Sequence, residues 1–205
     1  MTASRSPSSP DFLIFIRHGQ TDWNAELRLQ GQRDIPLNSL GESQAFSNGQ
    51  RLGAYLNHEG LSPAAFRFVA SPLGRTRKTM DLLRAGMGVS DGEYHLEPKL
   101  RELTFGDWEG FTTEELKQTS PDLVAARYDD KWGFVPPNGE SYAMLSERIS
   151  QWIETVSEPT IVVAHGGVFR ALRGLLENID TADVPMLDTP QDKVFVWRQG
   201  AFTTI

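Results

Sequence analysis

Two histidines followed by glycine are the first candidates for chemistry in this chain. His18-Gly19 comes directly after Arg17 and the apolar run at 12–16, and His165-Gly166 follows a second apolar run at 160–164. In open α/β sheets, ligands bind beyond the carboxyl ends of the strands. Glycine lets the backbone approach a ligand closely, and its N–H group can face an anion. The two histidines are therefore expected to share one site.

Two arginines indicate what that site could bind. Arg17 precedes His18, and Arg75 falls in the first turn of a helix that we expect after Ser71-Pro72. Guanidinium groups match the geometry of phosphate oxygens and keep their charge at any working pH. A neutral imidazole carries a lone pair that can attack phosphorus. Since phosphoryl transfer depends mainly on positioning and on stabilising oxygen charge, these residues predict a phosphoryl-transfer site.

A proton donor for the leaving oxygen is also needed, and the segment 100–110 supplies candidates. Glu102 is our first choice, because a carboxyl group in an apolar, aromatic loop can act as an acid near neutrality. Asp107 and Glu109 are its local rivals, and chemistry alone does not choose among the three.

The elements that must position these groups alternate along the chain. Continuous apolar runs, rich in β-branched and aromatic residues, predict buried strands at 12–16, 66–70, 160–164 and 194–197. Helical signals fall between them: a helix from Asn38 or Ser39 to about Asn57, one capped by Ser71 with Pro72 at its first position, a short one opening at Thr112, an apolar stripe from Tyr142 to Val156, and one after Gly166-Gly167. This alternation predicts an α/β fold, a three-layer sandwich around a mostly parallel central sheet.

Length and composition narrow the class of protein further. The 205 residues are expected to form a flexible tail at 1–10 and a single domain at 11–205, in which 86–140 is a lid insertion. The chain has no cysteine, which excludes disulfides, thiolate metal sites and a cysteine nucleophile. Its net charge of −7 argues against a nucleic-acid partner. Without an apolar segment for a secretory signal or a bilayer span, a cytoplasmic protein with no membrane partner is expected.

The motif around His18 resembles a known signature. Arg17-His18-Gly19-Gln20-Thr21 with Trp23-Asn24 is similar to that of the histidine phosphatase superfamily, which has the phosphoglycerate mutase-like fold. Further blocks resemble the family in the same order, at 34–45, 71–76, 100–110, 137–141 and 163–167. The resemblance extends over almost the whole chain after the tail.

The resemblance implies a role for each matching residue. His18 would be the nucleophile that becomes phosphorylated, and Glu102 the general acid that later activates water. The phosphoryl oxygens would be held by Arg17, Arg75 and His165, with a further contact from Asn24. Gln20 stands where many relatives carry glutamate, a change expected to affect substrate fit. The family's reaction implies no metal and no cofactor, and the two histidines also lack the i, i+4 spacing of familiar metal sites.

Three functions remain in competition. The first is a phosphatase that hydrolyses a small phosphomonoester through a phosphohistidine, because the segment 104–110 resembles the phosphatase branch, including α-ribazole phosphatase-like enzymes. The alternative is a cofactor-dependent phosphoglycerate mutase. A mutase must exclude water from its site, which usually needs enclosing structure, and little chain follows the run at 194–197 to form a closing tail. A non-catalytic phosphate-binding protein is the third, although such a protein would often have lost the nucleophile or the acid.

Overall fold

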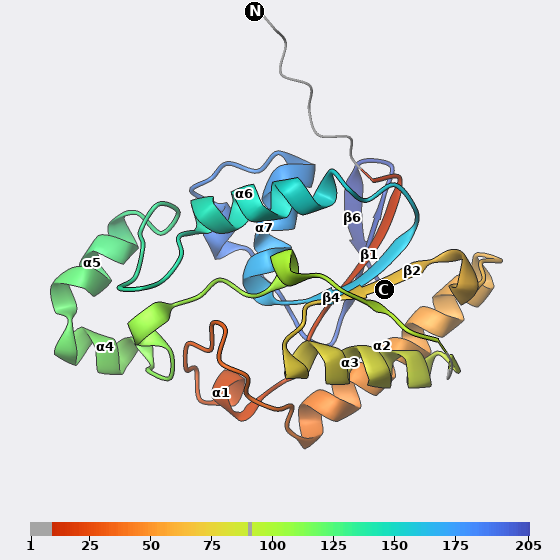
Figure 1. The fold of residues 1–205 in the computed structure, drawn as a ribbon, viewed down its shortest axis with the longest axis horizontal. Coiled ribbons are helices and arrows are strands. Elements are labelled where there is room, and N and C mark those ends of the chain that lie inside the picture. The colour runs from red at the N-terminus through yellow and green to blue at the C-terminus, as the bar shows by residue number, and fades with distance from the viewer. Residues whose placement is uncertain (1–9, 90–91) are drawn as a thin grey trace, which may run out of the picture.

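A six-stranded sheet forms the centre of the computed structural model, which describes residues 10–89 and 92–205 (Figure 1). The strand order is β3-β2-β4-β1-β5-β6. β1 pairs in parallel with β4, and β2 pairs in parallel with both β4 and β3, whereas β5 runs antiparallel to β1 and to β6. The strands are β1 (Phe12–Arg17), β2 (Arg67–Ala70), β3 (His95–Leu96), β4 (Thr160–Ala164), β5 (Val194–Arg198) and β6 (Ala201–Thr204). The predicted α/β fold with a mostly parallel sheet is confirmed.

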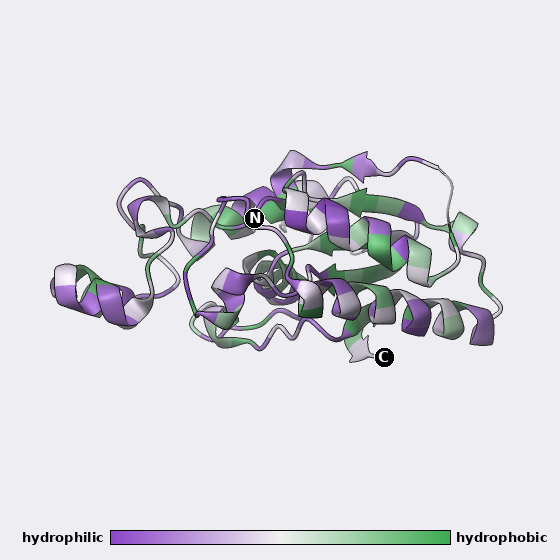
Figure 2. Ribbon diagram, turned by 90° about the horizontal axis from the view of Figure 1, so that it is seen from below, coloured by the Kyte–Doolittle hydropathy of each residue, from purple (hydrophilic) through white to green (hydrophobic). Residues whose placement is uncertain are grey.

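Helices cover both faces of the sheet. Successive side chains of β1 alternate, so that Leu13 and Phe15 pack in one buried cluster while Ile14 and Ile16 pack in another. The first cluster is closed by α6 (Tyr142–Ile153) and α7 (Gly166–Glu177), the second by α2 (Ser39–His58) and α3 (Gly74–Gly86). Figure 2 shows the strands mainly in the hydrophobic colour between these helices. The three layers are those expected from the sequence.

Helix starts follow the predicted caps with one exception. Asn38 caps α2 by accepting from the Gly41 N–H at 2.9 Å, and Thr112 forms a capping box with Glu115 at α4 (Thr113–Thr119). The prediction that Ser71 and Pro72 open the next helix is wrong, because α3 begins at Gly74.

The start of α3 is capped from another part of the chain. The Asp34 carboxylate accepts from the backbone N–H of Gly74 at 2.8 Å and of Arg75 at 3.4 Å. A full negative charge at the positive end of a helix is a stronger partner than a neutral hydroxyl. Ser71 is buried and bonds His165 instead, at 2.8 Å. The serine therefore serves the site rather than the helix.

The segment 86–140 has two parts. Its first part joins the sheet, since β3 pairs with the carboxyl end of β2. Its second part carries α4 and α5 (Pro121–Asp129), which Figure 1 places at the far end of the molecule from β2. A small separate core of Trp108, Leu116 and Val124 holds that part together. The short elements of the chain are α1 (Asp22–Ala25), η1 (Pro63–Ala65), η2 (Pro98–Leu100), η3 (Gly106–Trp108) and η4 (Val184–Met186).

The two ends of the predicted domain meet on the sheet. Nearly all of the predicted tail, residues 1–9, lies outside the described residues. Pro10 is the first described residue, and its carbonyl accepts from the Trp197 indole N–H at 2.9 Å. Within the described residues, no helix has the length and apolar character needed to cross a membrane.

Candidate active site

Two neighbouring parallel strands bring the histidines together. Arg17 at the end of β1 is in register with Ala164 at the end of β4, and the His18 N–H donates to the Ala164 carbonyl at 3.0 Å. The next residues along each strand, His18 and His165, have ring centroids 5.2 Å apart with the planes at 63°. The expectation of one shared site at the carboxyl ends of the strands agrees with this placement.

Glycines beside the histidines allow the surrounding backbone to close in. A Cβ added at Gly19 would collide with the Gly41 carbonyl, and one added at Gly167 would collide with the Glu102 carboxylate. These positions cannot carry a side chain without displacing the first turn of α2 or the Glu102 carboxylate.

His18 is held as a neutral imidazole with a defined tautomer. Its side chain is almost fully buried, and burial lowers its pKa well below the usual 6.5, helped by the charges of Arg75 and Arg17. Nδ1 lies 2.8 Å from the Gly19 carbonyl. Because a carbonyl only accepts, the proton must sit on Nδ1, which leaves the lone pair on Nε2.

His165 lies next to His18, is fully buried and does not line the pocket itself. Its Nε2 bonds the Ser71 hydroxyl at 2.8 Å, and its Nδ1 has no partner among the described residues. Burial lowers its pKa well below the usual 6.5, with smaller effects from Arg75 and His18. The unpartnered nitrogen leaves one hydrogen bond of this ring available to a ligand.

Arg75 is buried and Arg17 is half-buried, and neither has a carboxylate within 4.0 Å among the described residues. Arg75 donates to the carbonyls of Arg33 at 2.6 Å and Gly31 at 2.7 Å, and Arg17 donates to the Thr189 carbonyl at 2.6 Å. Burial lowers the pKa of Arg75, and it lowers that of Arg17 to about 10, so both remain cationic near neutrality. The Nε atom of each is buried and has no partner within the described residues. Two desolvated cations of this kind form an anion site.

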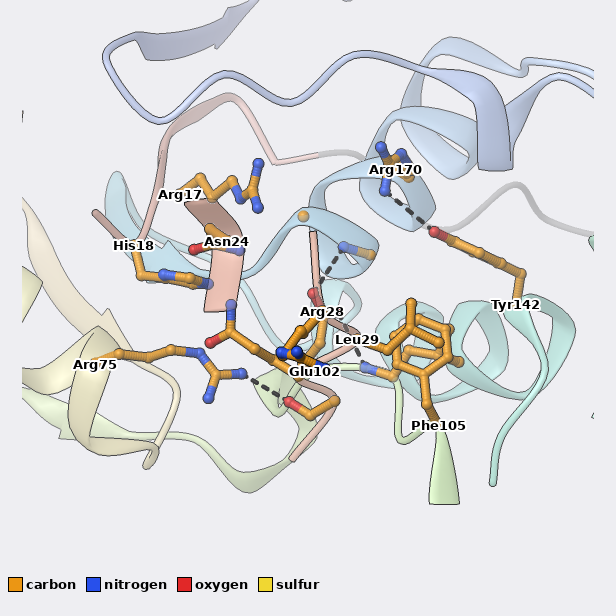
Figure 3. A pocket seen from close by; sticks show the side chains of 15 residues that line it. Arg17, His18, Asn24, Arg28, Leu29, Arg75, Glu102, Phe105, Tyr142 and Arg170 are labelled. Atoms are coloured by element: carbon orange, nitrogen blue, oxygen red, sulfur yellow. Dashed lines mark hydrogen bonds between the residues drawn. The ribbon is translucent and has the colours of Figure 1, made fainter. Parts of the chain in front are cut away.

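Glu102 lines the same pocket as His18, and Figure 3 shows it between Arg75 and Phe105. Its Oε1 accepts from the Leu103 N–H at 2.9 Å, and its Oε2 accepts from the Gly167 N–H at 3.1 Å. Both oxygens are thus fixed in position while the side chain lines the pocket.

The rival carboxylates are engaged elsewhere. Asp107 accepts from the Asn138 amide at 3.0 Å, and neither it nor Glu109 lines the pocket. Glu109 is buried and accepts from the Thr104 hydroxyl at 2.8 Å and the Gln32 N–H at 2.9 Å. Of the three candidates for the acid, the geometry favours Glu102.

Asn24 and Gln20 are placed differently. Asn24 lines the pocket, and its Oδ1 accepts from the Thr21 N–H at 3.2 Å and from Gln191 Nε2 at 3.0 Å, which turns its NH2 group away from these donors. Gln20 does not line the pocket, because its Oε1 accepts from Asn38 at 3.1 Å at the start of α2.

The loop before β5 also contacts the site residues, although the sequence did not predict it. Thr189 receives the Arg17 guanidinium, and Gln191 bonds both Asn24 and the His18 carbonyl, the latter at 3.0 Å. These partners lie 172, 167 and 173 positions away along the chain, so no local pattern marks the loop. A Thr-Pro-Gln segment before a strand would read as an ordinary turn.

The pocket has a volume of about 140 Å³, and its lining differs between its two sides. Figure 3 shows Arg75, His18 and Arg17 on one side, and Tyr142, Phe105 and Arg170 on the other. Across residues 10–89 and 92–205, no group of three or more metal-binding side chains gathers.

Comparisons with known proteins agree with this arrangement. The family model described as histidine phosphatase superfamily (branch 1) matches residues 13–199. Glucosyl-3-phosphoglycerate phosphatase of Mycolicibacterium vanbaalenii is 32% identical over 190 residues, covering 85% of this chain and 78% of that protein. A 2,3-bisphosphoglycerate-dependent phosphoglycerate mutase of Methylorubrum extorquens is 29% identical, covering 94% of this chain and 92% of that protein.

A solved structure supports the same assignment. The α-ribazole phosphatase from Shigella flexneri has a TM-score of 0.78 and 26% identity, covering 94% of this chain and 93% of that chain. The chain belongs to the histidine phosphatase superfamily.

Proposed function

We propose that this member of the histidine phosphatase superfamily hydrolyses a small phosphomonoester through a phosphohistidine at His18. The observation that carries the proposal is a buried, neutral imidazole whose Nδ1 bonds the Gly19 carbonyl at 2.8 Å, beside a buried Arg75 and a half-buried Arg17 that have no carboxylate within 4.0 Å among the described residues. Two similar proteins, named for phosphatase action on glucosyl-3-phosphoglycerate and on α-ribazole phosphate, support the same chemistry. We call Arg17, His18, Arg75 and His165 the phosphoryl site.

In the first step, the His18 Nε2 lone pair attacks phosphorus and the bond from phosphorus to the ester oxygen breaks. Glu102, in its protonated form, gives its proton to the departing oxygen, so the product leaves as an alcohol. Arg17 and Arg75 stabilise the charge on the equatorial oxygens, and His165 and Asn24 offer further hydrogen bonds.

In the second step, water attacks the phosphohistidine from the side that the alcohol has left. The Glu102 carboxylate takes a proton from that water, the bond between phosphorus and Nε2 breaks, and inorganic phosphate is released. Its two backbone hydrogen bonds, from Leu103 and Gly167, keep the carboxylate in place for both steps. His18 returns to its neutral form without any change of tautomer at Nδ1.

A phosphoglycerate mutase is the competing hypothesis, and the similarity to the Methylorubrum extorquens mutase favours it. A mutase would pass the phosphoryl group back to the substrate instead of to water. Sequence identity does not rank the two hypotheses, since a probable phosphoglycerate mutase of Erwinia tasmaniensis is 34% identical over 160 residues and the Mycolicibacterium phosphatase is 32% identical over 190 residues. We place hydrolysis first because the segment 104–110 resembles the phosphatase branch and because the similar solved structures include phosphatases for α-ribazole phosphate and glucosyl-3-phosphoglycerate.

The test is phosphate release from a panel of small phosphomonoesters, with a chelator present throughout. Wild type is expected to release phosphate and to form an acid-labile, base-stable phosphoprotein, and His18→Ala is expected to do neither. His58→Ala is the matched control, because His58 is an exposed residue of α2. Release that survives in His18→Ala would contradict the mechanism. Conversion of phosphoglycerate without release would identify a mutase.

We also propose that residues 11–205 form a single domain that works in the cytoplasm. The first part of the predicted lid, 86–140, belongs to the sheet through β3, so only the part after β3 would act as a lid, since Phe105 lines the pocket and Arg127 of α5 lies over the Phe105 ring at 5.8 Å. Small phosphorylated substrates, rather than nucleic acid, suit a chain with a net charge of −7.

A further inference from the structure

The wall of the pocket opposite Arg75 has no role in the proposed chemistry. Phe105, Tyr142 and Arg170 line it, and Figure 3 shows them on the side away from Arg75. A leaving alcohol bound at the phosphoryl site would extend toward this wall. Its side chains therefore indicate which alcohol the enzyme prefers.

Arg170 is held in place with part of its hydrogen-bonding capacity unused. Its Nε donates to the Leu187 carbonyl at 2.7 Å, and its Nη1 donates to the Tyr142 hydroxyl at 3.3 Å. Nη2 has no partner among the described residues, and no carboxylate lies within 4.0 Å of this guanidinium in that part of the chain. A positioned guanidinium with a free nitrogen at a pocket wall is suited to bind an anion.

Two further cations lie near Arg170, outside the lining of the pocket itself: one packs on Phe105, which lines the pocket, and the other contacts the residue before Leu187, whose carbonyl binds Arg170. Arg127 lies over the ring of Phe105 at 5.8 Å, and Lys131 Nζ contacts Met186 Sδ at 3.5 Å. Partial burial lowers the pKa of both, and the charge of Arg170 lowers each further, as expected for cations that are close neighbours. We call Arg127, Lys131 and Arg170 the outer cation cluster.

The outer cation cluster also lacks ion pairs. The described residues place no carboxylate within 4.0 Å of Arg127 or Lys131, although acidic residues outnumber basic ones in this chain, 27 to 20. Asp130, their neighbour in sequence, accepts from the Gly133 N–H at 2.7 Å instead. Three uncompensated cations repel one another, and an anionic ligand would relieve that repulsion.

We propose that the outer cation cluster binds a second anionic group on the substrate, so that the preferred substrates are phosphomonoesters whose alcohol carries a carboxylate or a second phosphate. This inference rests on the proposed function and names its substrate class. The phosphoryl site binds the group that is transferred, and the outer cation cluster binds the charge at the other end of the alcohol. A neutral alcohol would leave the cluster uncompensated.

The test compares three esters that share one skeleton. Glycerol 3-phosphate has a neutral alcohol, 3-phosphoglycerate replaces its terminal hydroxymethyl group by a carboxylate, and glycerol 1,3-bisphosphate carries a second phosphate there. Wild type is expected to release phosphate with a kcat/KM about tenfold or more higher for at least one anionic ester, since about 1.4 kcal/mol of extra binding corresponds to tenfold. The two anionic esters distinguish a carboxylate from a phosphate.

Variants then assign the preference to the cluster. Arg127→Gln and Lys131→Gln should each lower kcat/KM for the preferred anionic ester several-fold more than for glycerol 3-phosphate, and together they should remove most of the preference. Arg67→Gln is the matched control, because it also removes one cation but lies at the first residue of β2, the end of the strand opposite the site. Raising the salt concentration should weaken the preference in wild type and not in the double variant.

Each possible result either supports the inference about the outer cation cluster or overturns it. Equal kcat/KM for all three esters in wild type, or a preference that survives in the double variant with a native circular dichroism spectrum, would overturn the inference. p-Nitrophenyl phosphate separates this failure from that of the proposed function. If it is hydrolysed without any preference among the glycerol esters, only the inference fails. If no ester including p-nitrophenyl phosphate releases phosphate, the proposed function fails and the inference falls with it.

Discussion

The phosphoryl site and the outer cation cluster are both cationic, yet they are built in different ways. In the phosphoryl site, Arg75 is 1% exposed and both of its terminal nitrogens donate to backbone carbonyls. In the outer cluster, Arg127 and Lys131 are half-buried on the α5 side of the pocket and make no hydrogen bond to a backbone carbonyl of the described residues. The first region stands at the ends of sheet strands, whereas Arg127 and Lys131 of the second lie in and next to α5, beside a small separate core, and only Arg170 comes from a helix packed on the sheet. Under the two proposals, chemistry therefore depends on the sheet, and substrate preference depends in part on a segment outside the main core.

The largest expected difference between the two regions is in the loss of kcat/KM when an arginine of each is replaced by lysine. Arg75→Lys should lower kcat/KM for p-nitrophenyl phosphate by about 10²- to 10³-fold, because one ammonium group cannot reproduce the two carbonyl bonds and also bind phosphate as a fork. Arg127→Lys keeps a positive charge at a half-buried position and should lower kcat/KM less than about threefold. Steady-state kinetics on both variants measures the contrast. Equal losses would mean that the two regions do not differ in this way.

The second prediction concerns the acid. Glu102→Gln keeps most of the side chain but cannot donate a proton, so turnover of alkyl esters should fall about 10²- to 10⁴-fold. p-Nitrophenol leaves readily without a proton, so its ester should be affected much less. Leaving-group dependence of kcat in wild type and variant measures this. If alkyl and aryl esters slowed equally, the acid role of Glu102 would be untenable, whatever the outer cluster does.

A third prediction probes the loop before β5. Gln191→Leu removes the donor that holds Asn24 Oδ1 and the His18 carbonyl, and is expected to lower kcat about tenfold through misplacement of these two residues. The anionic preference assigned to the outer cluster should not change. The check combines Asn24→Asp with Gln191→Leu and compares the loss of kcat in the double variant with the losses in the two single variants. If Gln191 acts only by positioning its neighbours, the two losses should not add.

The smallest effect is on stability and follows from the two buried imidazoles. Burial lowers the pKa of His18 and His165 below 6.5, so as the pH falls through 6.5 the unfolded chain binds protons that the folded chain does not. The free energy of unfolding should therefore decrease below pH 6.5, approaching about 1.4 kcal/mol per pH unit for each histidine. Urea unfolding between pH 6.5 and 5.5 measures the slope.

A matched pair of variants assigns that slope to the phosphoryl site. His165→Gln should remove up to one histidine's share of the slope, whereas Arg127→Gln should leave it unchanged, because the arginine is cationic at both ends of this range. A slope that His165→Gln does not alter would show that this imidazole takes up its proton equally well in the fold.

Much of the architecture was predictable from local patterns. The strand expected at 160–164 is β4, and those expected at 12–16, 66–70 and 194–197 differ from β1, β2 and β5 by one residue at an end. β3 and β6 were not predicted, because β3 has two exposed residues and β6 only one partly buried aromatic, Phe202, so neither forms an apolar run. The helix α5 was also missed, since Val124 is its one fully buried residue.

The chemistry was predictable only in part. His18, His165, Arg17 and Arg75 could be placed at strand and helix ends from the sequence. The structure places Arg17, His18 and Arg75 in the lining of one pocket and the His165 ring 5.2 Å from that of His18. The choice of Glu102 over Asp107 and Glu109 needed the fold, because all three lie within eight residues of one loop. Their surroundings differ only through contacts with distant segments such as Gly167 and Gln32.

The sequence by itself determined the alternation of strands and helices, the ends at which the histidines stand, and the resemblance to a family. These depend on side-chain periodicities of two and 3.6 residues and on short motifs, which are local properties. Tertiary structure alone decided that Asp34 caps α3 in place of Ser71 and that His18 carries its proton on Nδ1. It also decided that Arg127, Lys131 and Arg170 have no carboxylate within 4.0 Å among the described residues. Charge state, tautomer and unpaired charge depend on which distant groups are brought near and on how much water they exclude, and only the folded chain settles both.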